Sequence, residues 1–258
     1  MSRFHVYCVA NNAGALARDL QSSPEIAERS VALTVLWNEA SASSAYARAI
    51  AEADADYLVF AHQDIYLPRG WFAGLSDAVN RLSRMDDRWA VAGLFGATHG
   101  GDLVGHVWDS ALGRVCGGSL VGPVRAAGLD EIVLIVRRAA NVGFDPALPG
   151  FHLYGTDVAL SAEAGGKTAY VIDLPAIHNT RPICRLGSDY GACYRFMVRK
   201  WHHWLPWPTV ILPLTRNPAP LALRRLRVRY KGVFRASTQF NQLPNPASKA
   251  LELGFGAR

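Results

Sequence analysis

Three short apolar runs near the start of the chain, at residues 4–10, 31–37 and 57–61, each have the length and composition of a buried β-strand. Helix-like segments separate them: Ser23-Pro24 is a typical helix start, and the alanine-rich residues 43–53 favour helix. An order of strand, helix, strand, helix, strand is typical of sheets whose strands run mostly parallel. The sequence therefore predicts an α/β domain in which helices flank a mostly parallel sheet.

The same alternation continues further along the chain. We expect a helix at 71–82, strands at 89–95 and 132–136, hairpins and loops in the glycine-rich stretch 96–128, a helix at 157–164 and a last strand at 169–172. Half of the 258 residues are hydrophobic, which excludes intrinsic disorder. No uncharged apolar segment of 18 residues occurs, so we expect no membrane-spanning helix, and we see no signal peptide.

The four cysteines are scattered, at Cys8, Cys116, Cys184 and Cys193, and no CxxC pair occurs. A zinc ribbon or a thioredoxin-like site is therefore not expected. Cysteines spaced in this way are typical of reduced core residues in a cytosolic protein.

Charge is distributed unevenly between the two parts of the chain. Residues 181–258 carry 14 lysines and arginines and two acids, whereas residues 1–180 carry 13 basic and 19 acidic residues. This division predicts a catalytic domain at 1–190, followed by a basic C-terminal extension at 191–258 that contains tryptophan and proline.

Polar clusters follow each of the first three predicted strands: Asn11-Asn12, Asn38-Glu39 and His62-Gln63-Asp64. In α/β sheets, ligands bind at the carboxyl ends of the strands. Residues two apart in extended backbone face the same side, so His62 and Asp64 could face one ligand together. A carboxylate there could hold a divalent cation that neutralises a diphosphate, or Asp64 could simply cap the turn before Pro68.

Two further residues carry candidate chemistry. Asp157 opens a predicted helix, where it could be an N-cap or a general base that faces the cleft. His178 follows the last predicted strand, where it could be structural or could join Asp64 on a metal. Mixed carboxylate and imidazole ligation would suit Mn²⁺ and still permit Mg²⁺.

The stretch from Leu58 to Pro68, with His62-Gln63-Asp64 at its centre, resembles the HQD motif of a glycosyltransferase-like family. This family is related to the streptomycin-biosynthesis F protein and is close to glycosyltransferase family 2. The segment from Asp130 to Asn179 resembles the same family. The matching pieces there are Ile135-Val136-Arg137-Arg138, Gly143-Phe144-Asp145, Gly150 to Asp157, and Asp173-Leu174-Pro175 with His178. The resemblance covers roughly residues 4–180.

The resemblance implies a GT-A-like, Rossmann-type fold, a nucleotide-diphospho-sugar donor and a divalent cation, Mn²⁺ or Mg²⁺. It implies a metal role for Asp64 and His178, although His62 replaces the first acid of the related DxD motif. Asp157 matches the base that deprotonates the acceptor hydroxyl, and the outcome would be inversion at the anomeric carbon. The remaining candidates are Asn11, Glu39, His62 and Gln63 for donor binding, and His152 and Tyr154 on the acceptor side.

The predicted function is therefore hexosyl transfer from a nucleotide sugar to a hydroxyl of a glycan, a lipid-linked molecule or a small molecule. One alternative is a degenerate domain that binds a nucleotide or a glycan without turnover. The other is a sugar nucleotidylyltransferase. The segment after the first strand, Asn11 to Ala15, matches the glycine-rich basic loop of that class poorly.

The basic segment 195–235 contains ten lysines and arginines and no acid, and Trp201, Trp204 and Trp207 lie within it. Such a segment suits an anionic membrane surface, where each basic residue adds about 1 kcal/mol. It could equally pack on the sheet with its tryptophans buried. No nucleic-acid-binding module is visible, so nucleic acid is not an expected partner. We expect a cytoplasmic enzyme, or one peripheral to the inner face of the membrane, in polysaccharide biosynthesis.

Overall fold

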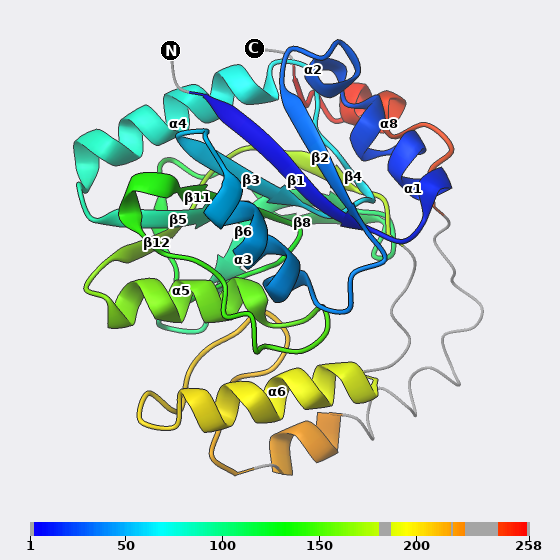
Figure 1. The fold of residues 1–258 in the computed structure, drawn as a ribbon. Helices are drawn as coiled ribbons and strands as arrows, with labels where there is room; N and C mark the ends of the chain where they lie inside the picture. The colour runs from blue at the N-terminus through cyan, green and yellow to red at the C-terminus, as the bar shows by residue number, and fades with distance from the viewer. Residues whose placement is uncertain (1–2, 181–186, 218, 225–241, 257–258) are drawn as a thin grey trace.

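The computed structural model describes residues 3–180, 187–217, 219–224 and 242–256. It confirms the predicted α/β class (Figure 1). The main sheet has seven strands, which in spatial order are β2 (Ala32–Trp37), β1 (Phe4–Ala10), β3 (Tyr57–Ala61), β11 (Val133–Arg137), β5 (Trp89–Gly93), β12 (Thr168–Val171) and β9 (Val124–Arg125).

The predicted parallel arrangement holds for five of these strands. β1 pairs in parallel with both β2 and β3, and β12 pairs in parallel with β5. β11 lies antiparallel between β3 and β5, so those two strands run in the same direction. β9 is antiparallel to β12 at the edge of the sheet.

A second sheet comes mainly from the glycine-rich stretch predicted to form hairpins. In spatial order its strands are β10 (Gly128–Leu129), β6 (Phe95–Ala97), β7 (Leu103–Asp109), β13 (Ala176–His178) and β4 (Ile65–Tyr66), with β8 (Arg114–Gly117) paired to β7. The expectation that 169–172 is the last strand was wrong, because β13 follows it. β13 has only three residues and adjoins Pro175, so nothing local marks it as a strand.

Helices cover both faces of the main sheet (Figure 1). One face packs against α3 (Ala42–Glu52) and α5 (Tyr154–Ala164). The other packs against α1 (Ala13–Arg18), α2 (Pro24–Ala27) and α4 (Trp71–Met85). Short 3₁₀ turns occupy Leu20–Ser22 and Arg138–Ala140. Towards the C-terminus lie α6 (Ser188–Lys200), a helical stretch at 219–224 and α8 (Pro246–Glu252).

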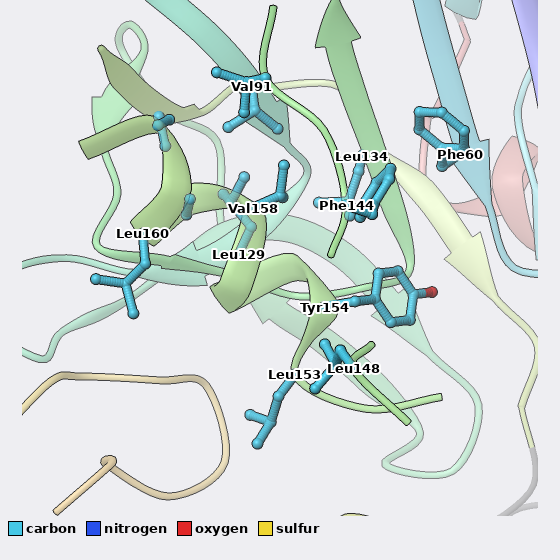
Figure 2. Close-up of a cluster of buried hydrophobic side chains, with 14 of the residues drawn as sticks. Phe60, Val91, Leu129, Leu134, Phe144, Leu148, Leu153, Tyr154, Val158 and Leu160 are labelled. Atoms are coloured by element: carbon cyan, nitrogen blue, oxygen red, sulfur yellow. The ribbon is translucent and has the colours of Figure 1, made fainter. Parts of the chain in front are cut away.

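The central strand β3 is buried on both faces. Leu58 and Phe60 belong to the apolar cluster beneath α3 and α5, whereas Val59 and Ala61 belong to the opposite cluster. Figure 2 shows the first of these clusters, in which Phe144 packs against both Phe60 of β3 and Tyr154 at the start of α5. A strand buried on both faces reads as a continuous apolar run, which is why YLVFA was recognisable in the sequence.

Asp86, at the end of α4, ties that helix to β12. One of its carboxylate oxygens accepts hydrogen bonds from the hydroxyls of Thr168, at 2.5 Å, and Tyr170, at 2.9 Å. The other accepts the Arg88 backbone N–H at 2.9 Å. Burial alone would raise the pKa of Asp86, but these hydrogen bonds outweigh it and hold the pKa below its ordinary value.

Two of the three tryptophans of the basic segment pack against the α/β body. Trp201 and Trp207 are each 9% exposed, and the Trp207 indole donates a hydrogen bond to the Ala127 carbonyl at 2.9 Å. Trp204 is 39% exposed. The packing alternative therefore holds for two of the three rings. Helix α6 crosses the expected domain boundary at 190, and that division remains a prediction.

Helix α8 and the residues after it return to the second sheet. Ala250 and Phe255 form a small apolar cluster with Tyr66, Trp108 and Ile177, which come from β4, β7 and β13. Across the described part of the chain, no helix has the length and apolar character needed to cross a membrane.

Cys8 and Cys193 are buried free thiols, as expected, and Cys116 is half-buried. Cys184 and residues 225–235 of the basic segment lie outside the described residues.

Candidate metal centre

The carboxyl ends of β1 and β3 are held together by Gln63. Its side-chain oxygen accepts the backbone N–H groups of Asn11, at 3.0 Å, and Asn12, at 2.9 Å. Its amide nitrogen donates to the Asn11 side-chain oxygen at 2.9 Å. Asn12 in turn caps α1 by accepting the Ala15 N–H at 3.0 Å. The structure thus brings the predicted residues Asn11 and Gln63 together, and their side chains bond to each other.

Glu39 lies along the same edge, after β2. The preceding residue, Asn38, has a left-handed backbone conformation and donates its N–H to the Ala10 carbonyl at 2.9 Å, which joins the ends of β2 and β1. The Glu39 carboxylate accepts a hydrogen bond from Arg48 of α3 at 2.6 Å. Asn11, Glu39 and Gln63 therefore lie at the ends of three adjacent strands.

His62, Asp64 and His178 converge beside this edge. An oxygen of the Asp64 carboxylate lies 3.9 Å from His62 Nδ1 and 3.7 Å from His178 Nε2. One ligand atom from each of the three residues lies within 4.8 Å of the others. His178 arrives from β13, which pairs with β4 immediately after the HQD segment, and the Asn179 N–H donates to the Asp64 carbonyl at 2.7 Å.

The donor set fits a divalent cation. With metal–ligand bonds of about 2.1 Å, neighbouring ligand atoms in octahedral or tetrahedral geometry lie about 3.0 to 3.4 Å apart. The separations of 3.7 and 3.9 Å from the Asp64 oxygen are slightly wider, so a cation would draw the side chains a few tenths of an ångström closer. Two imidazoles and one carboxylate on one face of an ion are a recurring arrangement for transition metals.

The protonation tendencies of His62 and Asp64 suit metal ligands, whereas His178 favours its protonated form. Burial lowers the pKa of His62, which favours the neutral ring that a metal needs. Burial alone would raise the pKa of Asp64, but His178 and His62 outweigh it and hold the pKa below its ordinary value. Burial would lower the pKa of His178, but the hydrogen bond to Asp109 and the charge of Asp64 raise it to about 8. A cation would therefore displace a proton from His178.

A second layer of groups orients both imidazoles. Asp109, at the end of β7, places a carboxylate oxygen 2.9 Å from His178 Nδ1, which leaves Nε2 facing Asp64. The Tyr154 hydroxyl lies 3.1 Å from His62 Nε2, which leaves Nδ1 facing Asp64. A carboxylate behind a ligating histidine is a frequent feature of metal sites, because it fixes the ring and its tautomer.

Asp157 is engaged by two residues at the C-terminal end of α6. It is 1% exposed, its two oxygens lie 2.8 and 2.9 Å from Lys200 Nζ, and the Trp201 indole donates to it at 2.7 Å. Lys200 also pairs with Asp145 at 2.9 Å. Burial raises the pKa of Asp157, and Lys200 and Trp201 lower it in part. The assignment of Asp157 as the base remains a prediction.

The two acceptor-side candidates lie in different surroundings. Tyr154 is buried and contacts His62, whereas the His152 ring packs edge-on against Tyr190 at 5.5 Å between centroids. The backbone of α5 packs closely against Leu129 at its second residue, Gly155. A Cβ at Gly155 would collide with the Leu129 carbonyl oxygen. A glycine is therefore required for the start of α5 to lie against β10.

Asp109 and Asp130 belong to the site but were not predicted. Asp130 precedes β11, close to the point where the Ile132 carbonyl accepts the His62 N–H at 3.0 Å. Burial lowers the pKa of His62, and the charge of Asp130 offsets part of that effect. Asp109 lies in the glycine-rich stretch, where no local motif surrounds it. Only the long-range pairing of β7 with β13 places Asp109 beside His178. The residues around Asp109 in the sequence therefore gave no indication of its position in the site.

No family model matches the chain. A curated relative from Fuscovulum blasticum, "ATP synthase subunits region ORF 6", is 31% identical over 163 residues. The match covers 58% of this chain and 61% of the relative, so it spans about three fifths of the relative's length.

Two solved structures resemble the chain along most of its length. The mannosyltransferase PcManGT from Pyrobaculum calidifontis, determined with GDP-Man and Mn²⁺, has a TM-score of 0.48 at 13% identity, covering 98% of this chain and 79% of its own. S. aureus TarS 1-349 has a TM-score of 0.45 at 13% identity, covering 91% and 72%. With TM-scores below 0.5, these likenesses alone assign neither an activity nor a substrate.

Proposed function

We propose that this chain is a glycosyltransferase that moves a sugar from a nucleotide-diphosphate donor to a hydroxyl acceptor with the help of a divalent cation. The convergence of His62, Asp64 and His178 at the carboxyl edge of β3 is the observation that supports this most strongly. His178 lies 114 positions after Asp64 in the chain, so local composition does not account for the cluster.

His62 Nδ1, one Asp64 oxygen and His178 Nε2 would hold the cation. Two imidazoles favour Mn²⁺ over Mg²⁺, because Mg²⁺ prefers an all-oxygen shell. When bound, the cation would neutralise charge on the donor diphosphate and on the departing nucleotide. Asn11, Glu39 and Gln63, at the ends of three adjacent strands, would line the nucleotide side.

Asp157 would remove the proton from the acceptor hydroxyl, and displacement at the anomeric carbon would invert its configuration. For that role Lys200 must release at least one carboxylate oxygen, because both oxygens now pair with it. Lys200 keeps Asp145 as a second partner, which lowers the cost of that release. His152 and Tyr154 would lie on the acceptor side.

The engaged state of Asp157 also favours a second candidate, a domain that binds a nucleotide or a glycan without turnover. In that case the Asp157–Lys200 pair serves only to anchor α6 to α5. Measurements of binding and of turnover separate the two functions, because the enzyme and a nucleotide-binding domain both predict metal-dependent nucleotide binding and only the enzyme predicts transfer.

Calorimetric titration with UDP, GDP and dTDP, each with Mn²⁺ and with EDTA, tests the shared part of the proposal. We expect one nucleotide to bind with Mn²⁺ and to bind much more weakly with EDTA. Asp64→Asn should remove the metal dependence, whereas Asp77→Asn, at an exposed position of α4, should not. Binding that ignores both the metal and the Asp64 substitution contradicts the proposal.

A further inference from the structure

A shallow groove runs between α6 and the helical stretch 219–224. It has a volume of about 440 Å³. Tyr194, Val198 and Leu221 form its apolar floor, and Arg195, Arg199 and Arg216 form its rim. We call this feature the arginine groove. In Figure 1, α6 lies below α5, with the helical stretch 219–224 below it in turn. None of the residues that line the groove belongs to the metal cluster.

The two faces of α6 explain how the groove forms. Tyr190, Met197 and the Tyr194 ring are buried and hold the helix against the body. Arg195 and Arg199, four residues apart, lie on its exposed face, one above the other. Apolar and basic side chains thus lie next to each other along the groove. The aliphatic stems of the arginines can cover apolar surface there while their guanidinium groups remain in water.

The charge of the rim is not compensated by carboxylates. No aspartate or glutamate occurs between residues 190 and 251. Within the described ranges, no ion pair involves Arg195, Arg199 or Arg216, although Arg216 donates a hydrogen bond to the His202 carbonyl at 3.2 Å. Lys200, one position further on, is fully used by Asp145 and Asp157. The rim therefore presents three cations to whatever approaches it.

Apolar side chains are exposed close to these cations along the chain. Leu223, on the same helical stretch as Leu221, is 50% exposed, and Trp204, in the turn after α6, is 39% exposed. Cations around an apolar surface, with an indole and an aliphatic chain exposed nearby, complement an anionic amphiphile better than a small soluble anion. A soluble anion would gain nothing from the apolar floor.

We propose that the arginine groove docks the protein on the surface of an anionic phospholipid bilayer, with lipid headgroups on the three arginines and acyl-chain surface on the apolar floor. For a glycosyltransferase, this would bring the site to acceptors that are linked to lipid. That use rests on the proposed function, but the docking itself requires neither donor nor transfer.

Co-sedimentation of the full chain with vesicles tests the docking. Vesicles of phosphatidylcholine alone should bind poorly, vesicles that also contain phosphatidylglycerol should bind well, and added salt should weaken the binding. At about 1 kcal/mol per basic residue, the variant Arg195→Gln/Arg199→Gln/Arg216→Gln should bind about a hundredfold more weakly. Leu223→Ser should also bind more weakly.

The matched control removes three positive charges elsewhere, as Arg81→Gln/Arg84→Gln/Arg114→Gln, all exposed in the structure. It should keep most of the binding. Equal losses in the two triple variants would mean that net charge alone attracts the protein, which overturns the proposal. Equal binding of the protein to both vesicle types would also overturn the proposal. The same holds if the protein binds an oligonucleotide more tightly than it binds vesicles, and the groove variant loses that oligonucleotide binding.

Nucleotide titration of the same variants separates this proposal from the previous one. The groove variant should bind Mn²⁺ and nucleotide like the unaltered protein. Loss of vesicle binding with intact nucleotide binding isolates the groove, and absent nucleotide binding with intact vesicle binding refutes only the catalytic proposal.

Discussion

Replacing Asp109 with asparagine should weaken Mn²⁺ binding without removing any ligand of the metal. Asp109 does not face the cation position directly. Its carboxylate lies 2.9 Å from His178 Nδ1, so in the neutral ring this nitrogen would keep the proton and Nε2, 3.7 Å from the Asp64 oxygen, would be free for the cation. An asparagine keeps the size of the side chain, but it loses the negative charge that strengthens this bond and fixes the tautomer.

Substitutions behind a ligating histidine typically reduce metal affinity 10- to 100-fold, or about 1.4 to 2.8 kcal/mol of binding free energy. We expect Asp109→Asn to fall in this range and Asp64→Asn, which removes a ligand, to lose more. The dissociation constant can be measured from the EPR signal of free Mn²⁺ during titration. Urea unfolding of each variant would show whether the fold is retained.

The chain offers a matched control for this substitution. Asp173 also places a carboxylate oxygen 2.9 Å from a histidine Nδ1, that of His106, which lies outside the cluster. Asp173→Asn should leave Mn²⁺ affinity unchanged. If Asp109→Asn binds Mn²⁺ as tightly as the unaltered protein, or if both variants lose affinity equally, the role assigned to Asp109 is wrong.

Three further substitutions test other parts of the structure. Asp157→Asn should keep nucleotide binding, lower transfer about 10²- to 10⁴-fold and cost about 1–3 kcal/mol of stability through Lys200; unchanged turnover would exclude Asp157 as the base. Asp86→Asn should cost about 2 kcal/mol at neutral pH in urea unfolding. Because folding lowers the pKa of Asp86, its contribution is present above the unfolded value of about 3.9 and is lost as pH falls through the folded value, so the variant should show a flatter acid limb. Gly155→Ala should cost about 1–3 kcal/mol, because its Cβ meets the Leu129 carbonyl; an unchanged unfolding midpoint would contradict that contact.

The sequence was sufficient for the elements whose apolar pattern is local. The strand at 57–61 was predicted with its observed ends because it is a continuous apolar run, and the strand at 4–10 likewise because it is mostly apolar and aromatic. The expected helix at 71–82 extends three residues further, to Met85. The antiparallel direction of β11 was not predictable, since a buried run looks the same in either direction.

The candidate site divides in the same way. Asp64 could be selected because it follows a strand directly, and His178 because of the resemblance. His62 was assigned to donor binding, whereas its Nδ1 lies with the two metal candidates. Asp109 required the pairing of β7 with β13, which is a contact across 69 positions. Lys200, which pairs with Asp157, lies in the segment that the resemblance does not cover. The ion pair could therefore not be predicted from the matched region.

The most direct test of the central claim is a turnover assay that follows release of nucleotide diphosphate from sugar-linked UDP, GDP and dTDP by mass spectrometry. We predict release from one donor class in the presence of Mn²⁺, with little release in EDTA or from the Asp64→Asn variant. Metal-independent release, or release that persists in Asp64→Asn, would contradict the metal centre. No release from any donor, with metal-dependent nucleotide binding intact and a range of acceptors supplied, would contradict the enzyme and favour the binding domain.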